Sequence, residues 1–193
     1  NIAFANELSN VSDALDVNVW EVVRLANRHP RVNILNPGPG VGGHCIAVDP
    51  WFIVSSAPKQ SELIRTARLI NDAKPKSVVQ KIKDAATLLK TLNIACLGLS
   101  YKADIDDLRE SPAVEIVRLL ADDQDLNCRV VEPHVDALPP ELQNLNNVKL
   151  ESLEGALKEA GVIVLLVDHA AFKAVDQKQL EGKAVIDTRG FWG

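Results

Sequence analysis

Hydrophobic and polar positions divide the chain into two parts with different periodicities. Up to about residue 90, apolar residues recur at helical spacing, as at Ile2, Ala5, Leu8 and Leu15. This spacing predicts a helix at the start of the chain and others from Asn18 to about 29, from about 49, from 61 to about 72, and from 75 to about 90. We therefore expect residues 1–90 to be all helical.

After residue 90 the apolar residues come in short unbroken runs, at 94–100, 129–132, 148–152, 162–168 and 184–188. Helical stretches at 112–122, at 152–160 and near 170–180 lie between them. Buried strands that alternate with helices form a parallel sheet covered on both faces. The expected fold class is α/β, with the all-helical segment followed by a doubly wound, mostly parallel, Rossmann-like sheet domain over residues 91–193.

Local signals sharpen some boundaries. Asn18 is expected to cap the second helix, with Glu21 as its capping-box partner, and Pro30 to end it. Ser111 and Pro112 are expected to start the helix after the first strand. Residues 30–47 are rich in Pro and Gly, and so long an irregular stretch in a compact protein is more often functional than idle.

Composition excludes several classes of protein. The 193 residues are 47% hydrophobic with a net charge of −5, which argues against disorder, nucleic-acid binding and membrane-surface binding. No apolar run approaches the ~20 residues that span a bilayer. The absence of Met and the helical pattern at residue 1 lead us to expect part of a longer protein, without a signal peptide.

Cysteine usage predicts a reducing, cytoplasmic compartment. The three cysteines at 45, 96 and 128 are widely spaced and contain no C-x-x-C pair, so neither a disulfide framework nor a zinc site is expected. Adjacent His44 and Cys45 lack the further ligands of a metal site, and we expect no metal. Cys96 and Cys128 fall in strand-like runs, where a thiol is usually an inert core residue.

Cys45 is the strongest candidate for chemistry. It lies in PGPGVGGHCIAVDP, where neighbouring glycines allow a ligand to approach the backbone closely. Helix dipoles and nearby cations can activate a thiol at a helix N-terminus. Asp49 is a candidate base, or a group that orients water, but it could equally be only a helix cap. The glycines themselves are not a dinucleotide fingerprint, because no strand precedes them.

The segment GLSYKADIDDLRESP at 98–112 is the second candidate. It follows the first strand, at the edge of the sheet where doubly wound folds bind ligands. Lys102 and Arg109 suit phosphate oxygens, although the loop's aspartates could merely neutralise them. Arg189, in DTRGFWG, follows the last strand and is expected near Lys102.

These three segments together resemble the UDP-glucose/GDP-mannose dehydrogenase family over essentially the whole chain. The front resembles the family's central dimerisation domain, and the back its UDP-sugar-binding domain. The segment NRHPRVNILNPGPGVGGHCIAVDPWF is similar to a branch that acts on 2-acetamido sugars. Enzymes for UDP-glucose typically carry Gly-Gly-Ser-Cys-Phe-Pro-Lys-Asp, whereas His44 and Ala47-Val48 stand here in place of the Ser and of Pro-Lys.

The resemblance implies a two-step, NAD-dependent oxidation of a sugar C6 alcohol to a carboxylate, with Cys45 as nucleophile and Asp49 assisting water. It also implies site residues, by match to family positions. Those for the UDP-sugar substrate are His29, Arg31, Gly42, Gly43, Tyr101, Lys102 and Arg189, with Arg31 usually reaching the neighbouring subunit of a homodimer. Arg109 matches an NAD-contacting arginine.

The same resemblance implies what this chain does not contain. The family's NAD-binding domain, and a catalytic lysine about three helical turns before residue 1, have no counterpart in it. We therefore expect the isolated chain to be inactive. Two rival hypotheses remain open, a non-catalytic UDP-sugar-binding or dimerisation module and a dehydrogenase for another UDP-sugar.

Overall fold

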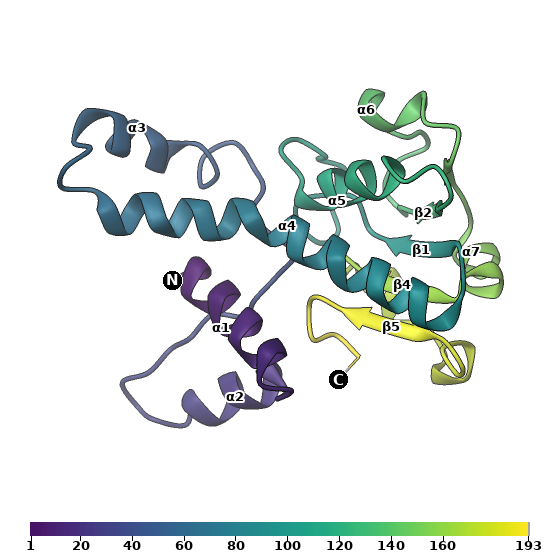
Figure 1. Cartoon of the computed structure of the whole chain (residues 1–193), viewed down its shortest axis with the longest axis horizontal. Helices are drawn as coiled ribbons and strands as arrows, with labels where there is room; N and C mark the ends of the chain where they lie inside the picture. Colours follow the sequence, from purple (N-terminus) through teal and green to yellow (C-terminus); the bar gives the residue numbers. More distant parts are fainter. Residues whose placement is uncertain (193) are drawn as a thin grey trace.

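The computed structural model describes residues 1–192 and confirms the two-part organisation (Figure 1). The front is helical, with α1 (Ile2–Ala14), α2 (Val19–Ala26), α3 (Asp49–Ser56) and α4 (Glu62–Leu89). The back alternates strands and helices: β1 (Asn93–Leu97), α5 (Pro112–Ala121), β2 (Asn127–Val131), α6 (Pro140–Gln143), β3 (Val148–Leu150), α7 (Leu153–Glu159), β4 (Val162–Leu165), the 3₁₀ helices η1 (Ala170–Ala174) and η2 (Gln177–Gln179), and β5 (Ala184–Asp187).

The strands form one parallel sheet in the order β3-β2-β1-β4-β5. The chain starts at the central strand β1, moves out to β3, and returns to β4 on the other side of β1. The sheet therefore reverses its winding between β1 and β4, and doubly wound folds bind ligands beyond the carboxyl ends of the strands at such a point. The expected fold class is confirmed.

Alternate residues of β1 point into two separate apolar layers, as the pleat of a strand requires. Ile94 and Cys96 lie in the layer that α4 and α5 cover, whereas Ala95 and Leu97 lie in the layer that α7 and η1 cover. All four side chains are fully buried. The short apolar runs therefore reflect a sheet without a solvent-facing side. Our boundary between the two parts, near residue 90, stays a prediction.

Helix α4 overturns one expectation. We expected a break between residues 72 and 75, but α4 runs unbroken through Pro75. A proline removes one helical hydrogen bond, and tertiary packing offsets that loss here. Pro75 is buried, and its ring lies 3.2 Å from the position that a side chain on Gly40 would occupy. The first half of α4 pairs with α3 in a projecting arm, and the second half covers the sheet (Figure 1).

Several other expectations needed correction. The stretch near 170–180 forms two short 3₁₀ turns, η1 and η2, instead of a helix. Strands β1 and β4 each end three residues earlier than the apolar runs at 94–100 and 162–168 predicted, because those runs continue into the loops at the edge of the sheet. Asn18 does cap α2, but Glu21 pairs with Arg24 rather than completing a capping box. Helix α6 was not expected.

The buried face of α1 is small and polar. It consists of Ala3, Ala5, Asn6, Ser9 and Ser12, and Leu15 lies beyond the helix, exposed. Asn6 is fully buried and donates from Nδ2 to Oδ1 of Asn71 in α4 (2.9 Å). Its own Oδ1 accepts the Gly38 N–H (2.9 Å). One side chain therefore ties α1, α4 and the Pro/Gly-rich segment together. No helix among residues 1–192 combines the length and apolarity needed to cross a bilayer.

Asn6→Ala tests this tie. The substitution leaves the Gly38 N–H and the Asn71 side chain buried without their partner, and each such loss costs about 1–3 kcal/mol. We expect the free energy of unfolding, measured by urea titration, to fall by about 2–4 kcal/mol. The exposed Asn144→Ala serves as control and should change it by less than about 0.5 kcal/mol. Equal effects of the two variants would contradict the role given to Asn6.

Candidate functional site

Three residues that the sequence singled out line one hollow at the carboxyl edge of the sheet. Tyr101 and Lys102 follow β1, and Arg189 follows β5. Together with Pro39, Gly40 and Asp168, among others, they line a small hollow of about 20 Å³. The expected proximity of Arg189 to Lys102 is confirmed. Two cations at the winding reversal make this hollow suitable for an anionic ligand.

Arg189 is held by carboxylates on both sides. Its Nε donates to Oδ1 of Asp168 (2.8 Å), and its backbone N–H donates to Oδ1 of Asp187 (2.8 Å). The next residue, Gly190, has a φ of 65° and leaves no room for a side chain, because the Trp20 ring of α2 lies 2.5 Å from where one would begin. Helix α2 thus presses on the turn that carries Arg189 and limits its movement.

The cysteine segment (residues 37–49) packs directly against the loop after β1. A side chain on Gly42 would begin 2.6 Å from the Glu110 carbonyl oxygen and 2.7 Å from Cβ of Tyr101. Gly43, with a φ of 81°, lies against the Tyr101 ring. Only glycine fits both positions, so the segment's glycines serve close packing as well as flexibility. They bring the segment that bears Cys45 to the residues around the hollow.

Cys45 and Asp49 are joined by one helical turn. The Asp49 N–H donates to the Cys45 carbonyl oxygen (2.8 Å), and residues four apart in such a turn lie on the same side. Both residues are exposed, whereas Cys96 and Cys128 are buried free thiols. Helix α3 begins at Asp49 itself, with Val48 at the cap position and no side-chain capping bond. The alternative reading of Asp49 as only a helix cap is therefore wrong.

Arg68 of α4 contacts the backbone of the cysteine segment. The residue is 5% exposed. Its guanidinium pairs with Asp72 and donates from Nη1 to the Ile46 carbonyl oxygen (3.5 Å). Ile46 directly follows Cys45, so α4 helps to fix the backbone next to the thiol.

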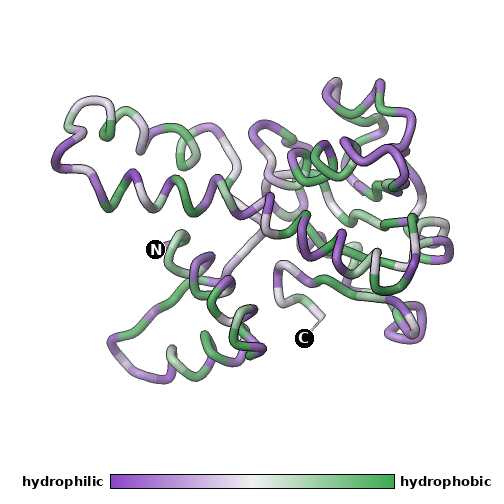
Figure 2. The backbone as a smooth tube through the Cα atoms, viewed as in Figure 1, coloured by the Kyte–Doolittle hydropathy of each residue, from purple (hydrophilic) through white to green (hydrophobic). Residues whose placement is uncertain are grey.

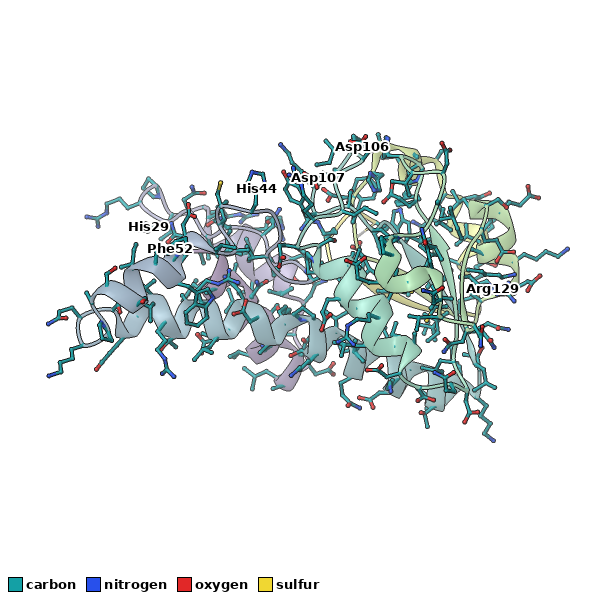
Figure 3. All side chains as sticks on the ribbon, turned by 90° about the horizontal axis from the view of Figure 1, so that it is seen from above. His29, His44, Phe52, Asp106, Asp107 and Arg129 are labelled. Atoms are coloured by element: carbon teal, nitrogen blue, oxygen red, sulfur yellow. The ribbon has the colours of Figure 1, made fainter. Side chains whose placement is uncertain are left out.

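The second cation of the 98–112 loop, Arg109, lies outside the hollow. Its guanidinium is 68% exposed and binds the Asp107 carboxylate through Nε (2.9 Å) and Nη2 (2.6 Å). These bonds, with a smaller contribution from nearby His44, lower the pKa of Asp107 to about 2. Figure 3 shows His44 of the cysteine segment beside this loop. The alternative that the loop's aspartates neutralise its cations therefore holds for Arg109, whose charge is paired with Asp107.

His29 and Arg31 do not join this hollow. Both are exposed in the segment after α2, where the Arg31 N–H donates to Nδ1 of His29 (3.3 Å). Among the described residues, neither one lines the space around Lys102. The structure thus brings together Gly42, Gly43, Tyr101, Lys102 and Arg189, with Cys45 and Asp49 on the adjoining exposed turn, and leaves His29 and Arg31 apart.

Sequence reasoning missed the residues that hold these groups in place. Asp168 is the last residue of the run at 162–168, a position that could have marked it as an edge residue. Arg68 and Asn71 have no such signal, because on a helical pattern they read as ordinary surface positions. Glu132 and His169, at the ends of β2 and β4, are both buried at the same edge of the sheet.

Two family models match the chain. The UDP binding domain of the UDP-glucose/GDP-mannose dehydrogenase family matches residues 95–193, and the central domain of that family matches residues 1–73. The central-domain match ends within α4, the helix that links the arm to the sheet, and the UDP-binding match begins in β1.

Named relatives agree with this match. The chain is 59% identical over 192 residues to an NDP-N-acetyl-D-galactosaminuronic acid dehydrogenase of Ralstonia solanacearum. It is 52% identical over 200 residues to the UDP-N-acetyl-D-mannosamine dehydrogenase of Escherichia coli strain K12. Both comparisons cover 100% of this chain, but 45% and 47% of those relatives, so the chain spans about half of their length.

Solved structures show the same fold. A UDP-N-acetyl-mannosamine dehydrogenase from S. aureus superimposes with a TM-score of 0.84 at 39% identity, over 98% of this chain and 44% of that one. A UDP-D-ManNAc dehydrogenase from Pyrococcus horikoshii gives a TM-score of 0.82 at 34% identity, over 100% and 45%. By its sequence over both halves and by its fold, the chain belongs to the UDP-glucose/GDP-mannose dehydrogenase family.

Proposed function

We propose that this chain is the central and UDP-binding part of an NAD-dependent dehydrogenase that oxidises UDP-N-acetyl-D-mannosamine to its uronic acid. One observation carries the proposal: the cations of the hollow, Lys102 and Arg189, lie next to a segment that presents a free, exposed thiol. A nucleotide sugar needs both, since its diphosphate must be bound while its sugar reaches a nucleophile.

The identity of the sugar rests on the relatives. Relatives from several bacteria carry the name UDP-N-acetyl-D-mannosamine dehydrogenase, and the one from Ralstonia solanacearum is named for N-acetyl-D-galactosaminuronic acid. These names share a 2-acetamido sugar, which supports that class of substrate. UDP-GlcNAc and UDP-glucose remain alternatives, and the product would serve as a precursor of surface polysaccharide.

In the proposed complex, the diphosphate lies over the mouth of the hollow, beside Lys102 and Arg189. Lys102 supplies a point charge and Arg189 a planar guanidinium, and both neutralise phosphate oxygens. Asp168 holds the Arg189 Nε, and Nη1 of the same guanidinium lies against Gly38 of the cysteine segment, so the charge is fixed beside the hollow. Tyr101 separates the hollow from Gly43, so the sugar would extend past this ring toward Cys45.

Cys45 would act as a nucleophile on the C6 aldehyde. Its sulfur adds to the carbonyl carbon, and the carbonyl oxygen takes up a proton to give a thiohemiacetal, whose oxidation yields a thioester. Water then attacks the thioester carbon, the carbon–sulfur bond breaks, and the sugar leaves as a carboxylate while Cys45 returns to a thiol. Asp49, one turn away on the same side, would orient that water or accept its proton.

NAD would supply the hydride acceptor for both oxidations. Residues 1–192 contain no glycine fingerprint that follows a strand, so the chain's own share of such a site would be small. Arg109 fits that share, because it is exposed and lies on the loop beside His44, facing outward. Asp107 fixes its orientation. We propose that an NAD-binding domain outside this chain provides the rest, and that the isolated chain is inactive.

The principal rival is a UDP-sugar-binding module without catalysis, and Cys45 distinguishes the two. In the longer protein that contains this chain, we expect Cys45→Ser to block the second oxidation, which needs a thiol, so that NADH production falls from two molecules per sugar to at most one. The assay should compare UDP-N-acetyl-D-mannosamine with UDP-GlcNAc. Cys96→Ala, in the core, is the matched control and should retain activity when folded. Full NADH production by Cys45→Ser would refute the nucleophile role.

Binding of UDP by the chain tests the phosphate site. Lys102→Gln and Arg189→Gln should each weaken UDP binding by roughly 10–100-fold, since a charge-assisted hydrogen bond contributes about 1.5–3 kcal/mol. Isothermal titration calorimetry gives the dissociation constants. The exposed Lys178→Gln removes the same charge from η2 and should leave binding unchanged. If all three variants weakened UDP equally, the effect would be one of net charge and not of this hollow.

We further propose a homodimer formed through the helical arm, in cytoplasm that keeps the thiols reduced. The arm of α3 and the first half of α4 projects from the sheet and exposes Phe52 (67%), Ile53 (51%) and Leu63 (83%). Figure 2 shows hydrophobic positions along both helices of the arm. A second copy covering this surface would remove it from water. Arg31 lies apart from this chain's own hollow, so in the proposed dimer it would reach the substrate bound by the partner subunit.

Leu63→Asp tests the arm as the dimer interface. A buried carboxylate opposes association, so size-exclusion chromatography with light scattering should show monomers at concentrations where the unmodified chain is dimeric. Leu88→Asp is the matched control, because Leu88 is 82% exposed at the other end of α4. Dissociation by Leu88→Asp instead of Leu63→Asp would place the interface elsewhere.

A further inference from the structure

A buried polar cluster at the carboxyl edge of the sheet has no part in the proposed chemistry. Glu132 follows β2 and His169 follows β4, and the side chains of both are wholly inaccessible to solvent. Burying a carboxylate is costly unless its oxygens are fully hydrogen-bonded. The two residues lie at the ends of the strands that flank β1, directly behind the loop that bears Tyr101 and Lys102.

Both oxygens of the Glu132 carboxylate accept hydrogen bonds. Oε2 accepts the backbone N–H of Leu99 (2.7 Å), the N–H of Ser100 (3.1 Å) and Nε2 of His169 (3.0 Å). Oε1 accepts the backbone N–H of His134 (3.0 Å). Burial acts to raise the pKa of the Glu132 carboxyl, but the bonds from His169 and the backbone hold it below its usual value. Glu132 is therefore an anion that accepts hydrogen bonds from the backbone at the point where the chain leaves β1.

His169 ties down the far end of the same loop. Its Nδ1 accepts the Asp104 N–H (2.9 Å), so the ring proton resides on Nε2 and points to Glu132. Asp104, whose φ is 59°, in turn accepts the Ala170 N–H through Oδ1 (2.9 Å). The loop from Leu99 to Asp104 is thus anchored to one Glu–His pair at both ends.

The anchored loop presents two residues of the proposed phosphate site. Tyr101 and Lys102 lie between the anchors, and Ser100 Oγ donates to the Lys102 carbonyl oxygen (2.6 Å). The Tyr101 N–H donates to the Asp107 carbonyl oxygen (3.1 Å). The Lys102 backbone is therefore fixed, while its side chain is free to reach a ligand.

A metal site is the other reading of this cluster. Ligand atoms of Asp104, His134 and His169 lie within 4.8 Å of one another, and a metal-bound histidine commonly donates its other ring N–H to a carboxylate. Here, however, the Nδ1 lone pair of His169 that would face a metal already accepts the Asp104 N–H. Binding an ion would require breaking that bond, so the closed hydrogen-bonded arrangement is the better explanation.

We propose that Glu132 and His169 are positioning residues, which hold Lys102 and Tyr101 in place for the diphosphate of the nucleotide sugar. This proposal rests on the proposed function. It predicts that disturbing the pair weakens binding of the diphosphate mainly through Lys102, although neither Glu132 nor His169 touches the ligand.

Glu132→Gln and His169→Asn test the pair. The first removes the charge and one acceptor, and the second keeps an acceptor near Nδ1 but loses the donor to Glu132. Well below the melting temperature, we expect each to raise the UDP dissociation constant about 10-fold or more, which is about 1.4 kcal/mol, without a comparable change for uridine. Glu151 directly follows β3 and pairs with Arg129 of β2. Glu151→Gln removes the charge of that pair, serves as the control and should bind UDP normally.

A double-substitution cycle separates positioning from general damage. In a Lys102→Gln background, Glu132→Gln should weaken UDP binding by less than about 2-fold further, because coupled residues are not additive. Additive losses, or equal losses for uridine, would overturn the proposal. So would a zinc-dependent rise in melting temperature that both His134→Ala and His169→Asn abolish. If the unmodified chain bound no UDP, the proposed function would fail first. Normal UDP binding by both variants would refute only the positioning role.

Discussion

The close packing of Gly42 against the loop after β1 determines where the proposed site can form. Gly42 lies so close to the Glu110 carbonyl oxygen and to Tyr101 that any side chain would force the segments apart. Cys45 is three residues further along, and Lys102 directly follows Tyr101. The thiol and the cation therefore belong to one site only as long as this contact persists. Asn6 fixes the other end of the cysteine segment through the Gly38 N–H, in a part of α1 that is otherwise small and polar.

The groups that support this contact are buried, whereas the groups proposed for chemistry are exposed. Asn6, Arg68, Glu132 and His169 lie in the interior, where their hydrogen bonds compete little with water. Cys45, Asp49 and Lys102 lie at the surface. A site made only of exposed side chains would be loose, since each would have to give up its own conformational freedom on binding. Buried polar partners remove that freedom from the backbone in advance.

Much of the fold could be predicted from the sequence, because the central strands β1 and β4 are short and mainly apolar and the segments between strands have helical spacing. The position of Arg189 near Lys102 followed from the rule that parallel strands end at the same edge. Pro75 misled the prediction, since its helix-breaking tendency is local while the packing that offsets it, on Gly40, comes from a segment far away in sequence. Figure 3 shows Arg129 and His29 toward opposite ends of the molecule, both apart from the hollow. The sequence alone did not indicate which charged residues lie near the proposed site and which lie far from it.

The roles of Glu132 and His169 could not be predicted for a different reason. A lone acidic residue and a lone histidine after two strands have no spacing that links them, and each reads as a solvated loop residue. Only the strand order places them on either side of β1, with β2 and β4 as its neighbours. The same order that forms the ligand crevice therefore also places a carboxylate and an imidazole behind it. A parallel sheet that reverses its winding at β1 provides a natural location both for an anionic ligand and for the buried groups that hold its binding loop.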